Sequence, residues 1–435
     1  MSSHITPAGE VALRYDKITG DRYHSREFMS REWEKMWTKV WHLGGISKQI
    51  PEPGDYVLHN FMNESVVMIR QAGGAIRAFY NTCQHRGNRL LTVEEGRVKS
   101  LQCPYHGWTY SLDGVVTEVL NPEDFPQGDP CGKLKLKEVA CEEWNGLVWY
   151  SMNENPVPLI EYLNPVPDLL RNRNIASMER VVWRTLSVET NWKFSPDNFN
   201  EAYHVSVVHP QFKPIIDEDY RNTVFEMYPS GHNRMIQKGQ PSSNADEPGK
   251  VGEPWADLLK SWDLDPDAFE GRAQEGRRAL QMQMRKLCKS RGYLHYQDWD
   301  DDELTDYFHH TLFPNVTLTA TPDGVHMYRT EPHPSDPNKC TFDYWFFAPA
   351  VEGLDSVSTI IGERPYEAAE HEFLTYGSEM SFDTTRLGTF LDQDLSVGVT
   401  QQQGLNSRGF SGAYLSGQES RVQRFHEVLN DYLES

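Results

Sequence analysis

Residues 83–108 read CQHRGNRLLTVEEGRVKSLQCPYHGW and contain two cysteines and two histidines in two tight pairs. One residue separates Cys83 from His85, two separate Cys103 from His106, and seventeen lie between the pairs. Zinc sites usually place about two to four residues within a pair, so the first pair is unusually tight for zinc. Two thiolates can instead hold one iron of a [2Fe–2S] cluster while two imidazoles hold the other. We therefore predict such a cluster on these four side chains.

The surrounding sequence is typical of short β-strands joined by tight turns. From about residue 42, alternating runs such as 65–69 are interrupted by Gly and Pro, and Asp113-Gly114 is a hairpin signal. This pattern predicts a small β-sandwich or barrel that closes near residue 150. Before it, residues 25–41 place apolar side chains on one face of a helix, with Ser25 as its N-cap.

A second group of candidate ligands follows in the segment 191–210, NWKFSPDNFNEAYHVSVVHP. Glu201 and His204 are three residues apart, about 60° around a helix, so they share a face. His204 and His209 are about 140° apart on a regular helix, so they meet one ion only where the backbone leaves helical geometry. Pro210 is consistent with such an ending. On these residues alone, two ordinary histidines near a helix end are as good an interpretation as a metal site.

The first motif, with CPYHGWTY at 103–110, resembles the signature of a Rieske domain. An N-terminal helix followed by such a domain resembles the large (alpha) subunits of Rieske non-haem iron oxygenases of the aromatic-ring-hydroxylating type. The order NWK, Asn-Phe and carboxylate-x-Tyr-His-x4-His-Pro is similar to the catalytic segment of these enzymes. The resemblance implies that His204 and His209 bind a mononuclear Fe(II), with one carboxylate completing a facial triad.

The carboxylate ligand is implied to lie in FLDQDL, residues 390–395, ahead of Gln402-x-Gly404. The spacing in the family favours Asp394, and Asp392 is the reserve candidate. Glu201 departs from the commonest pattern, which has Asp three residues before the first histidine. In the family this carboxylate links the second Rieske histidine of one subunit, here His106, to the iron site of the next. With Glu at this position, the chain is similar to the branch of the family that acts on quaternary ammonium substrates.

The resemblance implies an α+β fold, with an all-β Rieske [2Fe–2S] domain inserted ahead of an antiparallel-sheet-plus-helices catalytic domain of the helix-grip (START-like) type. We predict an N-terminal helical segment at 1–41 that packs with the catalytic domain. The Rieske domain is expected at 42–155 and the catalytic mononuclear iron domain at 156–435. Residues 240–305 read as a helical insertion, and helical periodicity is also present at about 366–378 and 417–433.

Composition narrows the classes of partner. The chain has 435 residues and a formal net charge of −21, which disfavours nucleic acid and anionic lipid. No apolar run approaches the roughly 20 residues of a membrane helix, and the N-terminus does not resemble a signal peptide. Six cysteines are too few for a disulfide scaffold, so we expect a cytoplasmic protein. The four cysteines outside the motif, Cys131, Cys141, Cys288 and Cys340, are expected to be buried thiols.

The implied activity is that of a terminal oxygenase, which takes electrons from a ferredoxin or an NAD(P)H-dependent reductase and uses O2 to hydroxylate an aromatic or related small organic substrate. A homotrimer (alpha3) is implied, and a beta subunit is possible. Two alternatives stay open: a monooxygenase or demethylase of quaternary ammonium or N-/O-methyl substrates, and a Rieske electron carrier without turnover. Basic residues near the cluster suggest a docking patch for an acidic donor or, equally, a lysine-protected strand edge. They are Arg86, Arg89, Arg97, Lys99, Lys133, Lys135 and Lys137.

Overall fold

The computed structural model describes residues 11–375 and 387–435, which form two compact units. Arg31–Asn164 make the smaller unit, and the larger unit joins residues up to Ser30 with Pro165–Ser435. The predicted boundaries at 41/42 and 155/156 both fall inside the smaller unit. Within the larger unit, the Tyr23 hydroxyl donates a hydrogen bond of 2.6 Å to Asp197, which ties the N-terminal segment to the helix that precedes the histidines.

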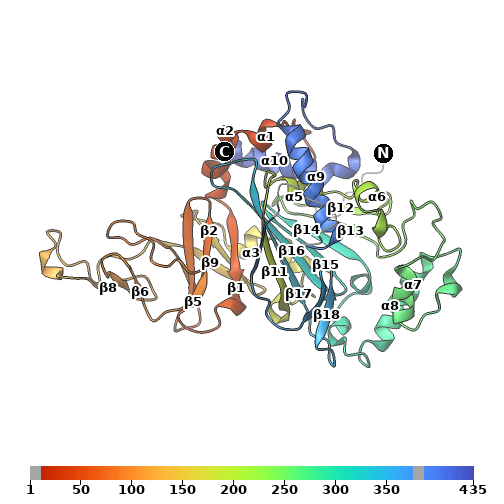
Figure 1. Ribbon diagram of the computed structural model, residues 1–435, viewed down its shortest axis with the longest axis horizontal. Helices are drawn as coiled ribbons and strands as arrows, with labels where there is room; N and C mark the ends of the chain where they lie inside the picture. The colour runs from red at the N-terminus through yellow and green to blue at the C-terminus, as the bar shows by residue number, and fades with distance from the viewer. Residues whose placement is uncertain (1–10, 376–386) are drawn as a thin grey trace. The chain divides into compact units, whose positions relative to one another are not determined.

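The smaller unit is built almost wholly from antiparallel strands, which confirms the predicted all-β domain (Figure 1). Its main sheet has the order β1-β10-β9-β4-β3-β2-β5 and a second sheet has the order β6-β7-β8. The strands are β1 (Trp41–Ile46), β2 (Asp55–Phe61), β3 (Glu64–Arg70), β4 (Ile76–Tyr80), β5 (Glu95–Arg97), β6 (Leu101–Gln102), β7 (Thr109–Tyr110), β8 (Val116–Glu118), β9 (Glu138–Trp144) and β10 (Leu147–Ser151). Asp113-Gly114 lies in the turn between β7 and β8, as the hairpin signal predicts.

The helix predicted at 25–41 is shorter than expected. The backbone N–H of Phe28 donates to the Ser25 hydroxyl at 3.2 Å, so Ser25 caps α2 (Arg26–Glu32) as predicted. The helix then widens into one π-helical turn, Trp33–Trp37, and ends there. Trp41 already begins β1, because tertiary packing of the strand outweighs the helical periodicity of its sequence.

The larger unit is organised around an eight-stranded sheet of order β12-β13-β14-β15-β16-β17-β11-β20. All neighbours are antiparallel except β11 and β20. The strands are β11 (Glu179–Val188), β12 (Val224–Met227), β13 (Asn233–Gln237), β14 (Tyr307–Leu312), β15 (Val316–Thr321), β16 (Gly324–Pro332), β17 (Cys340–Ala348) and β20 (Glu372–Thr375). A separate hairpin pairs β18 (Ser356–Thr359) with β19 (Gly362–Pro365).

Helices cover one face of this sheet (Figure 1). They are α5 (Phe194–Phe199), α6 (Val205–Val208), α9 (Thr389–Leu405) and α10 (Ser420–Glu434). Short helices α1 (Asp21–His24), α3 (Leu159–Tyr162) and α4 (Val166–Leu169) lie in the N-terminal and linking segments. The predicted α+β class is therefore confirmed, and α10 confirms the helix expected at 417–433. The sequence analysis did not predict α9.

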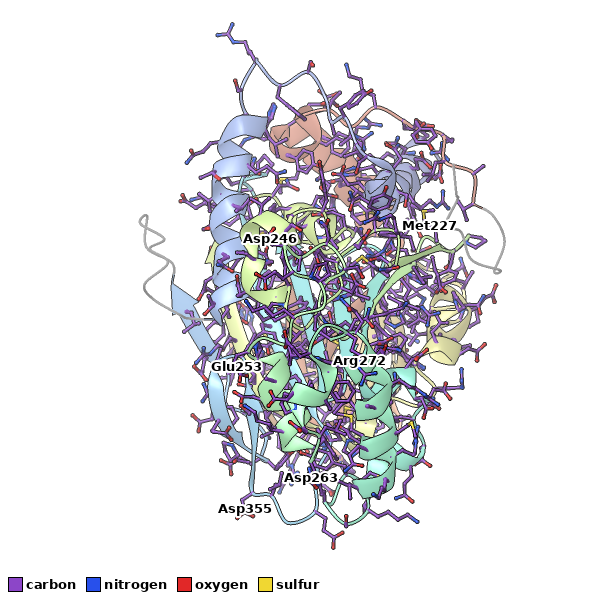
Figure 2. All side chains as sticks on the ribbon, turned by 90° about the vertical axis from the view of Figure 1, so that its right-hand side faces the viewer. Met227, Asp246, Glu253, Asp263, Arg272 and Asp355 are labelled. Carbon is purple, nitrogen blue, oxygen red and sulfur yellow. The ribbon has the colours of Figure 1, made fainter. Side chains whose placement is uncertain are left out.

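Two helices, α7 (Trp255–Ser261) and α8 (Glu275–Leu287), fill the stretch 240–305, which contains no strand. Figure 2 shows this side of the molecule, where Glu253, Asp263 and Arg272 mark the stretch. Its inner side is apolar, since Trp255, Leu259, Leu280 and Met284 are buried.

The prediction of a helix at 366–378 is wrong for the residues that the structure describes. Residues 372–375 form β20, which pairs with β11, and 376–378 lie outside the described residues. His371 explains the difference: its ring stacks on Trp183 at 3.9 Å and its Nε2 lies 2.7 Å from the Thr185 hydroxyl. Contacts with the neighbouring strand thus override the local periodicity.

Two further expectations can be compared with the structure. Within the described residues, we find no helix with the length and apolarity that a membrane crossing requires. Cys288 and Cys340 are buried as expected, whereas Cys131 and Cys141 are only partly buried.

Candidate metal centres

Three predicted ligands meet in the larger unit. Nε2 of His209 lies 2.8 Å from Oδ1 of Asp394, and Nε2 of His204 lies 3.6 Å from the same oxygen. One donor atom from each residue lies within 4.8 Å of the others, a separation suited to one metal ion. The structure brings Asp394 to the histidines and keeps Asp392 at the start of α9, where its Oδ1 accepts the Leu387 N–H at 3.3 Å.

The backbone explains how histidines five residues apart converge. The helix between them, α6, is only four residues long, and His204 precedes it while His209 follows it. His209 has φ −124° and ψ 52°, which is not helical. The departure from helix that the spacing requires therefore occurs at His209, next to Pro210.

Each histidine is held by a second partner on its other ring nitrogen. Nδ1 of His204 lies 2.6 Å from Oε1 of Glu201, and Nδ1 of His209 lies 2.8 Å from Oε1 of Gln393. Asn198 donates to Oδ1 of Asp394 at 3.3 Å. These contacts direct both Nε2 atoms toward Asp394, and such outer partners normally orient metal-ligating histidines. Burial alone would lower the pKa of His204, but the carboxylates of Glu201 and Asp394 raise it above its ordinary value.

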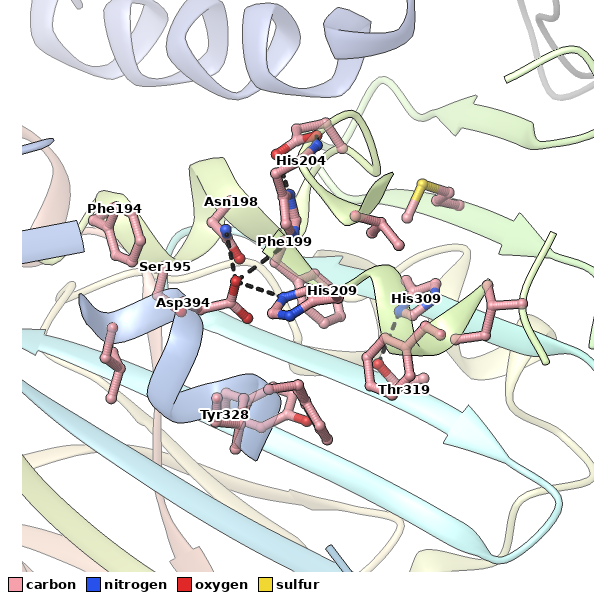
Figure 3. Close-up of a pocket in the computed structure, with 18 of the residues that line it drawn as sticks. Phe194, Ser195, Asn198, Phe199, His204, His209, His309, Thr319, Tyr328 and Asp394 are labelled. Atoms are coloured by element: carbon pink, nitrogen blue, oxygen red, sulfur yellow. Dashed lines mark hydrogen bonds and ion pairs between the residues drawn. The ribbon is translucent and has the colours of Figure 1, made fainter. Parts of the chain in front are cut away.

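An apolar cavity adjoins this group, as Figure 3 shows. Its apolar walls include Val205, Phe212, Met235, Phe342 and Leu395. Phe199 and Val205 also line it, and Val208 is not among its described lining residues. The sequence analysis did not find Asn198, Gln237, Tyr328 or Gln393, because nothing in their local sequence marks them as site residues.

The four predicted cluster ligands also meet, in the smaller unit. Cys83 and Cys103 are buried, and the rings of His85 and His106 lie 4.6 Å apart. Each pair sits on a tight turn, closed by a hydrogen bond from the glycine N–H to the cysteine carbonyl. These glycines, Gly87 and Gly107, have φ values of 77° and 71°, which other residues rarely adopt.

The donor set in the smaller unit fits a [2Fe–2S] cluster. Nδ1 of His85 is buried without a hydrogen-bond partner, as expected of an atom reserved for a metal. The Tyr110 hydroxyl lies 3.2 Å from Sγ of Cys83, and hydrogen bonds to cluster sulfurs are one of the factors that tune a cluster's potential.

Comparison with known proteins identifies the family. Residues 175–435 match the family described as "Ring hydroxylating alpha subunit (catalytic domain)", and residues 40–129 match the "Rieske [2Fe-2S] domain". The chain belongs to the ring-hydroxylating alpha-subunit family. The two domains together imply two cofactors, a Rieske [2Fe–2S] cluster and a mononuclear iron.

Curated relatives in this family include both monooxygenases and dioxygenases. The oxygenase subunit of glycine betaine monooxygenase from Chromohalobacter salexigens is 29% identical over 43% of this chain and 42% of its own length. That of carnitine monooxygenase from Acinetobacter baumannii is 30% identical over 48% and 56%. The large oxygenase component of naphthalene 1,2-dioxygenase from Pseudomonas putida is 33% identical over 42% of each. The chain thus matches about half the length of these relatives.

Solved structures share the fold over nearly the whole chain. A quaternary ammonium Rieske monooxygenase superposes with a TM-score of 0.67 at 18% identity, covering 96% of both chains. Naphthalene 1,2-dioxygenase with bound indole superposes with a TM-score of 0.66 at 20% identity, covering 98% of this chain and 94% of the other. At these identities the likeness concerns the fold.

Proposed function

We propose that this chain is the terminal oxygenase component of a multicomponent Rieske oxygenase. It would use O2 and electrons from a ferredoxin or an NAD(P)H-dependent reductase to hydroxylate an aromatic or related organic substrate. The observation that carries this proposal is the convergence of His204, His209 and Asp394 beside an apolar cavity. Two imidazoles and one carboxylate are the facial triad of non-haem iron oxygenases, which leaves coordination positions open.

Each side chain then has a defined role. The cluster would be held by Cys83, His85, Cys103 and His106. The iron would be held by His204, His209 and Asp394. When bound, the cluster supplies single electrons and the iron supplies the site at which O2 is activated. Glu201 and Gln393 fix the tautomers and directions of the two histidines by accepting from their Nδ1–H groups. The apolar wall excludes water and positions the substrate beside the iron site.

Electron transfer between chains follows from the family's arrangement. Glu201 would link His106 of the partner subunit to His204 in a homotrimer, and a beta subunit is compatible with this arrangement. The surface next to Glu201 supports an interface there, because Tyr203 and Val207 are 59% and 82% exposed although both are large and apolar. A closed head-to-tail ring would cover them.

A donor protein would dock on the basic side chains near the cluster. All seven predicted residues are exposed, and two of them are paired: Arg97 with Asp55 at 2.5 Å and Lys137 with Glu154 at 3.9 Å. Lys133 and Lys135 form no ion pair with any other described residue, so their charge is available to an acidic partner. We also place the protein in the cytoplasm, where its free thiols would stay reduced.

A monooxygenase or demethylase acting on a quaternary ammonium substrate is the second candidate. Two observations favour it: Glu201 stands where most members have Asp, and relatives of this chain act on glycine betaine and carnitine. The third class, an electron carrier without turnover, needs only the cluster and gives no reason for a second set of ligands.

Metal analysis separates an oxygenase from a carrier. Anaerobically reconstituted protein should contain about three irons for every two acid-labile sulfides, two in the cluster and one at the triad. Equal amounts of iron and sulfide, with the cluster's chromophore intact, would contradict the oxygenase. A substrate panel with a generic reductase, scored for product and for uncoupled peroxide, would then identify the reaction.

A further inference from the structure

A second, larger cavity adjoins the one beside the triad. The two cavities share wall residues, among them Phe212, His309, Thr319, Tyr328 and Phe390. We call the second cavity the outer chamber; it has a volume of about 340 Å³ and is lined mainly by α7, α8, the segment 293–307 and the strands β15 and β16. Specific small-molecule sites commonly occupy cavities of about this size. The outer chamber is therefore large enough to hold part of a substrate.

Among the described residues that line the outer chamber, Asp323 supplies the only carboxylate. No lysine or arginine is among the described residues that line either cavity. Asp323 is exposed, and it has no hydrogen-bond or ion-pair partner among the described residues. Its carboxylate can therefore meet a ligand that enters the chamber.

Arg173 is the basic side chain whose charge acts on Asp323, but its guanidinium binds other groups. Arg173 is fully buried and donates to the backbone carbonyls of Thr321 at 2.8 Å and Glu303 at 3.1 Å. Its guanidinium also stacks on Trp299 at 3.4 Å. Arg173 therefore lowers the pKa of Asp323 through its charge but does not hydrogen-bond to it. The Asp323 carboxylate is left free to bind a ligand in the chamber.

Aromatic side chains line the same chamber as this carboxylate. Trp262, Tyr293, Tyr296 and Tyr307 line the same chamber, and the rings of Tyr293 lie 5.3 Å from Trp262 and 5.0 Å from Tyr296. Burial raises the pKa of all three tyrosines, and the nearby charge of Asp323 raises it further. Aromatic faces together with a carboxylate are surroundings that stabilise an ammonium group.

Turn preference alone does not explain this arrangement. Asp323 precedes Gly324 in the hairpin between β15 and β16, and Asp-Gly is a common hairpin turn. The turn accounts for an aspartate at this position. It gives no reason for a cavity walled by four aromatic side chains on the inner side of that turn.

The distance from the triad sets the length of the ligand. Tyr328 lies at the triad end, where the charge of Asp394 contributes to raising its pKa after burial. Tyr328 and Gly324 are four residues apart on β16, which corresponds to about 13 Å of extended strand. A molecule that reaches both Asp394 and Asp323 must therefore be elongated.

We propose that the substrate of this oxygenase is an elongated, largely apolar amine, whose ammonium group binds Asp323 in the outer chamber while the carbon to be oxidised lies beside His204, His209 and Asp394. The proposal rests on the proposed function for the role of the triad. It also excludes substrates that carry a carboxylate, because a second anionic group would find no cationic side chain on the described walls.

Binding of three matched probes to the cluster- and iron-loaded protein tests the proposal without turnover. The probes are 6-phenylhexylamine, 6-phenylhexan-1-ol and 6-phenylhexanoate, and binding is measured by calorimetry. We expect the amine to bind at least about tenfold more tightly than the alcohol, and the carboxylate to bind least. The variant Asp323→Asn should bind the amine about tenfold more weakly and the alcohol as before.

Asp298→Asn is the matched control, since Asp298 is exposed and lies outside both cavities. It should retain the preference for the amine, and thermal unfolding should show that both variants are folded. Equal binding of amine and alcohol, an unchanged preference in Asp323→Asn, or no binding of any probe would each overturn the proposal. The iron-to-sulfide ratio reports separately on the proposed function, so the two can fail independently.

Discussion

Oε1 of Glu201 lies 2.6 Å from Nδ1 of His204, three residues later in the chain. The other carboxylate oxygen accepts the backbone N–H groups of Tyr203 and His204, so the side chain also closes the turn between α5 and α6. Glu201 thus fixes both the direction of the His204 ring and the backbone that carries it. A carboxylate in this position raises the basicity of the histidine and holds its tautomer.

Replacing Glu201 with Gln should leave both metal centres occupied and reduce turnover by about 10- to 100-fold. The amide keeps the size of the side chain but loses the charge that orients His204 and that we propose links the subunits. Glu201→Asp, which keeps the charge and shortens the reach by one methylene, should retain more activity than Glu201→Gln. Product formation and iron content are the measurements. Full turnover in Glu201→Gln would remove the linking role.

Asp394 and Asp392 can be distinguished by iron content. Asp394→Ala should lose the mononuclear iron, so that the ratio falls from about three irons per two sulfides to about two, with the cluster's absorption unchanged. Asp392→Asn is the matched control, because the Asp392 carboxylate accepts the Leu387 N–H at the start of α9. It should keep all the iron and lose about 0.5–2 kcal/mol of helix stability at most. Iron loss only in Asp392→Asn would reverse the assignment.

The sequence predicted the parts of this fold whose chemistry is local. Cysteine and histidine spacing predicted that the residues at 83–106 converge, because both pairs sit on tight glycine turns. The spacing of His204 and His209 likewise required a break in the helix, and the break occurs at His209. Such features depend on a few consecutive residues, so contacts with distant parts of the chain do not change them.

Features that depend on contacts between distant residues could not be predicted from the sequence. Helix α9 carries Asp394, yet its apolar residues do not gather on one face, so its sequence lacks helical periodicity. Residues 372–375 pair with β11 because of contacts with Trp183 and Thr185, nearly 190 residues away. Gln393 and Asp323 acquire their positions only once the sheet and helices have assembled.

Acidification should destabilise the larger unit through His326. Burial lowers the pKa of His326 to about 3, and its Nδ1 lies 2.9 Å from the Tyr344 hydroxyl. Between this value and the ordinary pKa of about 6.5, the unfolded state binds more protons than the folded one, so stability falls as pH falls. The fall should be about 2 kcal/mol from pH 7 to pH 5 for this residue.

Urea denaturation at pH 7 and pH 5 measures this effect. His326→Gln cannot titrate in this range, so its midpoint should depend less on pH than that of the unaltered protein. His309, whose pKa burial also lowers to about 3, should account for part of the dependence that remains. Equal pH dependence in the two proteins would show that the folded protein does not hold His326 in its neutral form.

Charge reversal on the smaller unit tests the docking site of the electron donor. Lys133 and Lys135 are exposed, and each change to Glu would place a negative charge where an acidic donor approaches. Because complementary charge mainly raises the association rate, the double variant should reduce donor-dependent turnover several-fold at low salt and little at high salt. The control is Lys286→Glu with Lys289→Glu, an equal change in net charge at exposed positions of the larger unit. Unchanged turnover at low salt in the Lys133 and Lys135 variant, or an equal loss in the control, would leave only the protective role of lysines at a strand edge.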